Sequence, residues 1–599
     1  MLATLLSFIF FTALVAGITW YKSRGEDISS NSGFFLAGRS LTFPFIAASL
    51  LLTNLSTEQL VGLNGQGYTT GLAVMMWEVV GVVAIVLMAL FFLPKFLKSG
   101  ITTVPELLDI RFGGRAQLVC NVIFMLAYMF ILLPMILYTG AQGMMGILDL
   151  HAVTGIRSDT TLLWSMVWPI GIIGSVYALF GGLRSIVISD LLNGIGLLVG
   201  GFMITFFGLW ACGAVDLGGA ASHGGSILGG LRNLAADIPE HINSIGGEGG
   251  QAPFLEIFTG IILINVFYWC TNQQIIQRTL AASSLKEGQK GVLLCGFLKL
   301  IGPLYLVLPG IMAFFLFRHG VIKPSSEAVT HVVDGVTHLK EANAYGELVR
   351  TVLPPWLAGF FAAVMAGAVL SSFNSALNST CTLFSLGIYK KLRPEASDLT
   401  CVRAGKWFGL AIAIGAMTLS PMLDSVGSIF KYLQNMNSIY FIPILAVVLV
   451  ALLSRRAPEG AALVGLVGGV LLIGAGYFVL PQIPGCDIVG AMGEYHFVGA
   501  CFLLLLDVML AIGLVAPRAA SHEFADAKAV SLEPWRGAKL AGAALIAVIL
   551  AIYATFADFT VLRDAAGNYP FCRFLCRAIP AVLPTLALFW LTRASDRRA

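Results

Sequence analysis

Long apolar runs recur along the whole chain and are separated by short polar stretches. The runs are roughly 18–25 residues long, which is the length a helix needs to cross the ~30 Å hydrocarbon core of a bilayer. We therefore predict an all-α polytopic membrane protein with about 15 spans. The spans are predicted at about 2–20, 42–69, 72–95, 117–145, 161–180, 186–212, 255–277, 289–317, 354–388, 402–422, 427–453, 459–480, 495–516, 538–557 and 576–592.

The composition agrees with this class. The chain has 599 residues, of which 57% are hydrophobic and only 11% are charged, whereas a soluble domain usually has about 25% charged residues. The net charge of +4 does not indicate a nucleic-acid partner, because the charges are sorted by side of the membrane rather than clustered. We expect the lipid bilayer as a partner and no nucleic acid.

The positions of Lys and Arg predict the orientation. No basic residue precedes the first apolar run, whereas Lys22, Arg24 and Arg39 follow it, which is the reverse of the order in a cleavable signal peptide. We interpret this run as a retained helix with its N-terminus outside. Alternating the remaining spans then places most Lys and Arg inside. This arrangement predicts a multi-pass protein of the cell inner membrane with a cytoplasmic C-terminus.

The ten cysteines lie mostly inside apolar runs, where a buried thiol behaves as a small hydrophobic group. Cys572 and Cys576 share one predicted external loop, and the sequence leaves open whether they form a disulfide bridge or stay as free thiols. No cysteine spacing is typical of a zinc site.

The region 42–453 divides into two halves with five predicted spans each. Each half begins with a span that carries a polar cluster at mid-depth, "TNLSTEQ" in the first and "NVFYWCTNQQ" in the second. An odd number of spans gives the halves opposite orientations, which is typical of inverted-repeat transporters with discontinuous helices at the binding site. The predicted organisation is an extra N-terminal helix and inner loop (1–41), a first repeat (42–212), an external loop (213–254), a second repeat (255–453) and extra C-terminal helices (454–599).

The first polar cluster holds six polar residues within positions 53–59. Backbone groups without partners cost several kcal/mol in hydrocarbon, so a helix breaks only where it lines protein or a water-filled cavity. A single such residue is usually explained by packing between helices, but six in seven positions favour a binding site. Freed carbonyls could coordinate a cation there, and Asn54, Ser56 and Gln59 could face a substrate.

Glu78 and Lys299 lie well inside predicted spans, and Asp190 lies near the inner end of another. A charged side chain at mid-bilayer costs at least about 2.5–3.5 kcal/mol and defaults to a functional hypothesis. Glu78 and Lys299 either belong to a substrate site or form a structural ion pair, and both alternatives require them to face the protein interior. Asp190 either binds a second cation or pairs with Arg184.

The segment "AGAVLSSFNSALNST" (366–380) is rich in hydroxyl groups. Spacings of three and four residues place Ser372, Ser375 and Ser379 on one helical face. Hydroxyl and carbonyl oxygens are hard ligands, which suit a hard monovalent cation better than a transition metal. Helix–helix packing explains the same pattern equally well.

Amide and aromatic side chains in two further spans indicate a neutral, polyhydroxylated ligand. Phe430 and Gln434 lie four residues apart on one helical face, and Asn265, Tyr268 and Trp269 cluster in the second polar segment. Amides hydrogen-bond hydroxyl groups, and aromatic rings pack against the C–H faces of a sugar. An interfacial aromatic belt is the alternative for Tyr268 and Trp269, although the neighbouring amides argue against it.

Several motifs taken together resemble the sodium:solute symporter family, and most closely its sodium–glucose/galactose cotransporter branch. The motifs are "FFLAGRSL", "NLSTEQLVG", "GGLRSIVISDLLN", "NQQIIQRTLAA" and "SSFNSALNSTCTLFSLGIYKK", and the resemblance runs over most of residues 33–455. It implies a leucine-transporter-like core of five plus five helices, with one extra N-terminal and about four extra C-terminal helices.

The resemblance also implies roles for individual residues. The implied sodium site consists of the carbonyls of Leu52, Leu55 and Ala368 and the hydroxyls of Ser371 and Ser372, and Asp190 with Ser375 resembles a second sodium site. The implied sugar contacts are Gln59, Glu78, Asn265, Lys299 and Gln434. Tyr268 would cover the sugar on the cytoplasmic side, held by Asn54, and Leu63 and Phe430 would close the outer side.

We therefore predict a secondary active symporter that couples sodium entry to uptake of a neutral monosaccharide, a hexose such as galactose or glucose or a close derivative. One alternative is a symporter of the same family for an amino acid, a vitamin or an anion, although Glu78 would repel a simple anion. The other is a membrane-embedded enzyme. Enzymes of that kind need paired carboxylates, a HExxH-like helix or a nucleophile–base pair, and the predicted spans contain none of these.

Overall fold

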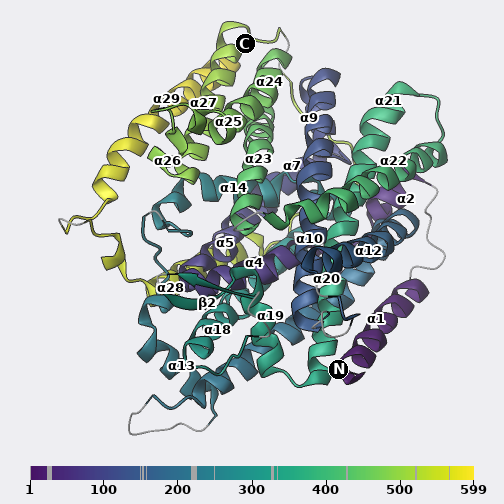
Figure 1. The fold of residues 1–599 in the computed structure, drawn as a ribbon. Helices are drawn as coiled ribbons and strands as arrows, with labels where there is room; N and C mark the ends of the chain where they lie inside the picture. Colours follow the sequence, from purple (N-terminus) through teal and green to yellow (C-terminus); the bar gives the residue numbers. More distant parts are fainter. Residues whose placement is uncertain are drawn as a thin grey trace.

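The computed structural model describes residues 2–22, 30–148, 150, 154–156, 158–217, 225–248, 250–324, 329–333, 335–425, 429–519, 522–564 and 567–598. Within these residues the chain is almost entirely helical, and the one hairpin, β1 (Thr330–Val333) with β2 (Val336–Leu339), is antiparallel. Figure 1 shows the helices crossing in one bundle, with the two termini at opposite ends. The predicted helical class is confirmed.

Twelve helices in the described part of the chain are long and apolar enough to cross a membrane. A thirteenth crossing is formed by α16 (Leu285–Leu300) and the segment Pro303–Arg318, which are bent by 48° at a short break. The bend coincides with Pro303, which cannot donate a backbone hydrogen bond and so weakens the helix there. These apolar helices show that the chain is a multi-pass membrane protein.

Two further apolar helices are too short to cross alone, namely α3 (Phe43–Asn54) and α14 (Gly260–Cys270). A second helix continues each of them after a break, α4 (Thr57–Thr70) in the first case and α15 (Gln273–Leu280) in the second. Both breaks fall in the polar clusters that the sequence singles out. The count of about 15 spans stays a prediction, because the number of crossings depends on how these broken pairs are counted.

The other helices of the first half follow the broken pair α3/α4 in chain order. The segment Leu72–Ser99 contains a π-helical turn at Met88–Phe92, and so does the next long segment at Tyr128–Leu132. The elements are η2 (Leu72–Met75), α5 (Met76–Val79), α6 (Gly81–Leu87), α7 (Leu93–Ser99), α8 (Val104–Arg111), α9 (Gly114–Ala127), α10 (Leu133–Leu148) and α12 (Asp159–Gly213).

The segment α12 differs from the prediction of two spans joined by an inner loop. Two stretches within it, Thr160–Leu179 and Ser185–Gly213, are each apolar enough to cross, but the backbone stays helical through the residues that join them. The joining segment "GGLRS" contains no proline, so its amides can keep the helical hydrogen-bond pattern.

The second half is organised in the same way around longer helices. Short segments between the long apolar helices precede and interrupt it, namely α13 (Ile227–Asp237), η5 (Pro239–Ile242), η6 (Phe254–Phe258) and α19 (Glu341–Val352). Its remaining elements are α17 (Pro303–Leu306), α18 (Leu308–Arg318), α20 (Pro355–Phe384), a π-helical turn (Ser385–Tyr389), α22 (Asp398–Leu419) and α23 (Ile429–Leu453). The domain limits proposed from the sequence stay predictions.

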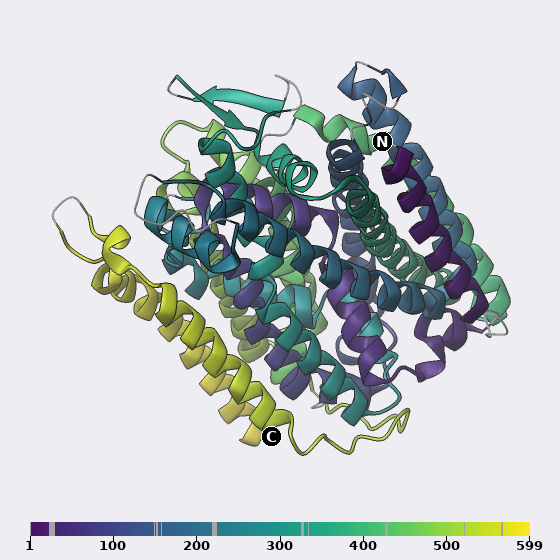
Figure 2. The same ribbon diagram turned by 90° about the horizontal axis from the view of Figure 1, so that it is seen from below.

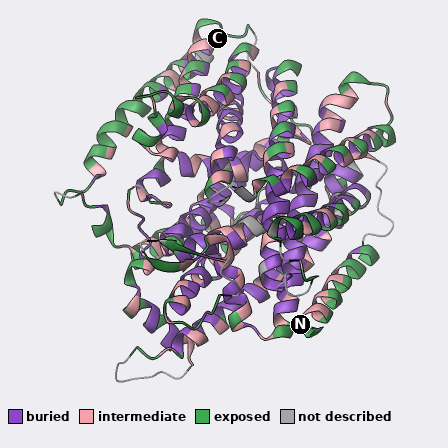
Figure 3. Ribbon diagram, viewed as in Figure 1, coloured by how far each residue is buried: buried purple, intermediate pink, exposed green. Residues whose placement is uncertain are grey.

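The C-terminal helices cover one side of the bundle, where α27 packs against both α23 and α29 (Figure 1). The most apolar stretches of α1 (Leu2–Lys22) and α29 are only 6% buried, and Figure 3 shows both helices as largely exposed. Their apolar exposed faces identify them as lipid-facing. The remaining elements are α24 (Glu459–Leu463), a π-helical turn (Val464–Gly468), α25 (Gly469–Phe478), α26 (Ile488–Met492), α27 (Glu494–Val515), α28 (Ala538–Phe556) and α29 (Phe571–Arg598).

Cys572 and Cys576 lie in the first turns of α29. Both are exposed free thiols in the structure. Of the two alternatives that the sequence leaves open, the structure therefore agrees with free thiols rather than a disulfide bridge.

Candidate functional site

The first break separates α3 from α4 at Leu55 and Ser56. Leu55 has φ −76° and ψ 63°, and Ser56 is extended, so neither continues the helix. The last carbonyls of α3 therefore lack the amide partners that a continuous helix would supply. Leu52 and Leu55 are fully buried here, whereas the side chains of Thr57 and Glu58 lie outside the described part of the structure.

The helix α20 brings hydroxyl groups to this break. Ser372 Oγ lies 3.5 Å from the carbonyl oxygen of Thr53, and Ala368, Ser371 and Ser372 are all buried. Backbone carbonyls from one element and hydroxyls from another thus meet in the protein interior. This is the hard oxygen environment that a sodium ion requires, and it is the place at which the resemblance implies one.

Asp190 lies beside this group, at the centre of a buried hydrogen-bond network. Its Oδ1 accepts from Ser371 Oγ at 2.5 Å and its Oδ2 from Ser49 Oγ at 2.6 Å. The Arg278 guanidinium lies 3.8 Å from Oδ2, and both side chains are completely buried. Arg278 also donates to Ser375 and to Ser49. A resident cation, the guanidinium, therefore sits between Asp190 and Ser375.

Sequence reasoning missed Arg278 because it follows the second polar cluster and was assigned to an inner loop. In the structure it belongs to α15, whose residues are all buried. The missed signal was Asp190 itself, since a carboxylate within the membrane needs a positive partner. The alternative partner, Arg184, has a side chain that lies outside the described residues.

A second buried group forms around Lys299 on α16. Its Nζ lies 2.6 Å from Glu78 Oε1 and 2.6 Å from Asn54 Oδ1, and it lies 5.3 Å from the ring centre of Trp269. Glu78 comes from α5 and Asn54 from the end of α3. The structure therefore joins the two intramembrane charges that the sequence predicts to face the interior.

Asn265 on α14 completes this group, because of the space left by Gly81. A Cβ atom at Gly81 would lie 2.9 Å from Asn265 Oδ1 and 2.9 Å from Lys299 Cε. A side chain at position 81 would displace the ends of Asn265 and Lys299, so Gly81 leaves the space that they occupy. We refer to Asn54, Glu78, Asn265 and Lys299 as the central polar cluster.

Two other predicted sugar contacts lie on the helices around this cluster. Gln59 is half-buried on α4 and its Oε1 has no hydrogen-bond partner, and Gln434 on α23 is 8% exposed. No hydrogen bond joins either of them to the central polar cluster among the described residues. Asn54 accepts a hydrogen bond from Lys299, and its predicted contact with Tyr268 stays a prediction. The Tyr268 ring packs edge-on against Trp269.

Aromatic side chains pack together beside α4, where the sequence predicts the outer gate. The Phe430 ring meets Trp77 edge-on at 5.4 Å, and Trp77 meets Tyr495 at 5.5 Å. A Cβ atom at Gly62 would lie 3.2 Å from Phe430, so the ring is pressed against α4. Leu63, the other predicted outer-gate residue, is fully buried on the same helix. The rings of Phe430, Trp77 and Tyr495 thus form one aromatic cluster at the place predicted for the outer gate.

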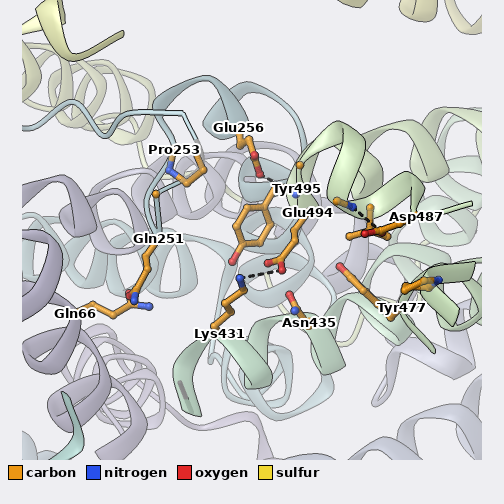
Figure 4. Close-up of a pocket in the computed structure, with 15 residues that line it drawn as sticks. Gln66, Gln251, Pro253, Glu256, Lys431, Asn435, Tyr477, Asp487, Glu494 and Tyr495 are labelled. Carbon is orange, nitrogen blue, oxygen red and sulfur yellow. Dashed lines mark hydrogen bonds and ion pairs between the residues drawn. The ribbon is translucent and has the colours of Figure 1, made fainter. Parts of the chain in front are cut away.

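A polar cavity of about 430 Å³ lies next to this gate (Figure 4). Lys431 Nζ lies 3.0 Å from Glu494 Oε1 there, and the Tyr495 amide donates to Glu256 Oε2 at 2.8 Å. Figure 4 shows the Lys431, Glu494 and Asn435 side chains converging on it. A solute that approaches the gate from this side meets amides and charges before it meets the aromatic rings.

The sequence matches the model of the sodium:solute symporter family over residues 34–469. An uncharacterized symporter of Escherichia coli strain K12 is 40% identical, over 93% of this chain and 91% of that protein. The sodium/glucose cotransporter of Vibrio parahaemolyticus is 32% identical over 77% of this chain and 83% of its own length. Sodium/glucose cotransporter 1 of Ovis aries is 29% identical over 84% of this chain and 77% of its own.

Among solved structures, a substrate-bound, outward-open Na⁺-coupled sialic acid symporter covers 86% of this chain and 98% of its own, with a TM-score of 0.69 at 18% identity. At that identity the likeness shows the fold, and it confirms the leucine-transporter-like arrangement of five plus five helices. The family model and the E. coli relative extend the agreement to the sequence. The chain is therefore a member of the sodium:solute symporter family.

Proposed function

We propose that this symporter couples the inward flow of sodium ions to the import of a neutral monosaccharide, a hexose such as galactose or glucose or a close derivative. The observation that carries the proposal is the central polar cluster. Its two charges lie 2.6 Å apart and compensate each other, so the cluster attracts neither a net anion nor a net cation. An ammonium group, a carboxylate and two amides together offer both donors and acceptors, which a polyol can use at every hydroxyl.

The relatives support the substrate class, since two of them are sodium/glucose cotransporters. The proposed sugar contacts are Gln59, Glu78, Asn265, Lys299 and Gln434. A sugar would enter between α4, α5, α14, α16 and α23, and its hydroxyls would replace part of the contact between Lys299 and its present partners. The proposed inner gate is Tyr268 with Asn54, and the proposed outer gate is Leu63 with Phe430.

Sodium would bind between the first break and α20, at the carbonyls of Leu52, Leu55 and Ala368 and the hydroxyls of Ser371 and Ser372. An ion there links the broken helix to α20, and so couples the sodium site to Asn54 in the central polar cluster. Occupancy by sodium would favour the arrangement in which the sugar site opens to the outside. The scaffold would then rock around the fixed site to release both solutes inside.

One sodium ion per cycle supplies enough free energy. A membrane potential of 100 mV gives about 2.3 kcal/mol per charge, and a tenfold sodium gradient adds about 1.4 kcal/mol. Together they support accumulation of the sugar by roughly 500-fold. Transport of this kind requires no catalytic residues, and we assign the protein no enzymatic activity.

The proposed setting is the cell inner membrane, with the N-terminus outside and the C-terminus in the cytoplasm. This orientation follows from the excess of Lys and Arg on the predicted inner side. The two termini lie at opposite ends of the bundle in Figure 1, as an odd number of crossings requires. The proposed partners are the sugar, sodium ions and the bilayer.

The test is uptake by the purified protein in liposomes. Labelled galactose and glucose should accumulate when an inward sodium gradient is imposed, and should not when potassium replaces sodium. A panel of unlabelled solutes that includes amino acids, vitamins, myo-inositol and sialic acid would then be added as competitors. Competition by one of these in the absence of hexose uptake would replace the sugar with that solute and retain the symporter.

A further inference from the structure

A cavity of about 610 Å³ lies at the other end of the bundle from the outer gate. The helix α23 connects the two regions, since Lys431 in its first turn lines the outer cavity and Leu453 at its end lines this one. A helix of 25 residues is about 37 Å long, which exceeds the hydrocarbon thickness. The second cavity therefore opens at the opposite membrane surface, which the basic-residue bias predicts to be cytoplasmic.

The lining of this cavity is strongly basic. Lys95 and Lys98 come from α7, Arg455 follows α23 and Arg593 lies near the end of α29. Among the described residues, Glu523 is the one carboxylate in the lining. Arg455 Nη2 lies 2.6 Å from Glu523 Oε1, so the opposite charges of these two side chains compensate each other. The three remaining basic groups converge from two helices without a carboxylate opposite them in the cavity lining.

His522, which also lines the cavity, has a ring nitrogen that lacks a hydrogen-bond acceptor among the described residues. The backbone amide of His522 donates to the Arg455 carbonyl at 3.1 Å, which fixes the loop against the end of α23. The Nε2 atom of His522 is buried and has no hydrogen-bond partner among the described residues. Such an atom usually signals a missing water or ligand, and a phosphate oxygen would satisfy it.

The surroundings of the cavity are apolar and lipid-facing. Phe91, Leu453 and Phe524 share its lining with the basic groups. The helix α29, which carries Arg593 into it, is exposed along most of its length (Figure 3), and a stripe of large apolar side chains runs along it. The stripe is formed by Ile579, Leu583, Leu586 and Trp590, each more than half exposed and three or four residues from the next.

We propose that this cavity binds the phosphate headgroup of an anionic phospholipid, with the fatty chains lying along the α29 stripe. Basic pockets between membrane helices on the cytoplasmic side have the chemistry for such headgroups. A free phosphate ion would satisfy the same basic groups but would leave the stripe unused. The position of the cavity, between lysines and a lipid-exposed helix, favours the lipid.

The test compares lipids on the purified, delipidated protein. Native mass spectrometry would measure retention of phosphatidylglycerol and of phosphatidylcholine, and the thermal midpoint would be recorded with each lipid and with inorganic phosphate. We expect phosphatidylglycerol to be retained preferentially. The double variant Lys98→Gln/Arg593→Gln should bind it about 30-fold more weakly, since each basic group near an anionic headgroup contributes about a factor of five.

Both substituted residues are exposed, so the double variant should keep the wild-type thermal midpoint in lipid-free detergent. Lys539→Gln, in the exposed first turn of α28, is the matched control and should bind like the wild type. Equal retention of both lipids, or unchanged binding by the double variant, would overturn the proposal. Stabilisation by inorganic phosphate equal to that by phosphatidylglycerol would assign the cavity to a soluble anion instead.

Discussion

The Nζ atom of Lys299 lies 2.6 Å from Glu78 Oε1, and each of these side chains is only 1% exposed. Asn54 Oδ1 accepts a second hydrogen bond from the same ammonium group. The ion pair thereby fastens α5 and α16 to the end of α3, where the first broken helix opens. Removing one member of a buried pair leaves an uncompensated charge, which typically costs about 3–5 kcal/mol.

Lys299→Ala should therefore lose sugar uptake and lower the free energy of unfolding by about 3–5 kcal/mol. The double variant Lys299→Met/Glu78→Leu should recover stability but not transport, because it removes both charges together with the sugar contacts. Uptake in liposomes and thermal unfolding in detergent measure the two effects. Lys290→Ala is the control, since this half-exposed residue lies on the same helix. Normal uptake by Lys299→Ala would refute the site assignment.

Gln434→Ala should abolish most sugar uptake while leaving the thermal midpoint nearly unchanged. The side chain is 8% exposed on α23. It makes no hydrogen bond to another described residue, so the change breaks none. The measurement is initial uptake against sugar concentration. Gln482→Ala, which removes an exposed amide bonded to its own helix, should transport like the wild type. Equal uptake curves for the two variants would exclude Gln434 as a sugar contact.

Ser372→Ala should weaken sodium dependence more than sugar selectivity. Its hydroxyl lies 3.5 Å from the Thr53 carbonyl at the helix break, so its loss removes an oxygen ligand from the proposed sodium site. We expect the sodium concentration for half-maximal uptake to rise by about tenfold. A tenfold change corresponds to about 1.4 kcal/mol of binding free energy, which is about the net contribution of one hydrogen bond. Ser175→Ala is the matched control, because that buried hydroxyl bonds only Gly171 of its own helix. An unchanged sodium titration for Ser372→Ala would count against the site.

Arg278→Gln should destabilise the protein by several kcal/mol, because it leaves Asp190 charged and buried without its cation. Asp190→Asn in addition should restore part of the loss, since the two groups lie 3.8 Å apart and are completely buried. A double-mutant cycle of unfolding free energies measures the coupling. Strictly additive losses would show that the guanidinium does not serve as the counter-ion of Asp190.

Acid should weaken the outer side through His241. Its ring stacks on Phe314 at 4.1 Å, and its backbone lies against the end of α4 at Gly71. Burial lowers the pKa of His241 below its usual 6.5, although Glu240 opposes the shift. The unfolded chain then binds the proton more readily than the folded one, so stability falls as the pH drops below about 6.5.

The measurement is the thermal midpoint between pH 8 and pH 5. His241→Phe keeps the stacking and removes the titrating group, so its midpoint should fall less on acidification than that of the wild type. His331→Gln, on the exposed hairpin, should keep the wild-type pH profile. Parallel profiles for wild type and His241→Phe would show that another group governs the acid response.

The sequence by itself determined the membrane class, the approximate spans and the two broken helices. Each of these depends on local pattern, because a run of about 20 apolar residues has no stable place except a bilayer. A polar cluster inside such a run must likewise face protein or water. The same argument required Glu78 and Lys299 to face inward, and the structure places both there.

Only the tertiary structure decided which polar groups meet. Lys299 and Asn54 are separated by 245 positions, and Arg278 and Asp190 lie on different helices, so no periodicity could pair them. The structure places Arg278 beside Asp190, a partner that the sequence did not suggest, because separation along the chain says nothing about how helices cross. The second sodium site at Asp190 stays a prediction. The contact of Phe430 with α4 has the same origin, since a Cβ atom at Gly62 would lie 3.2 Å from Phe430.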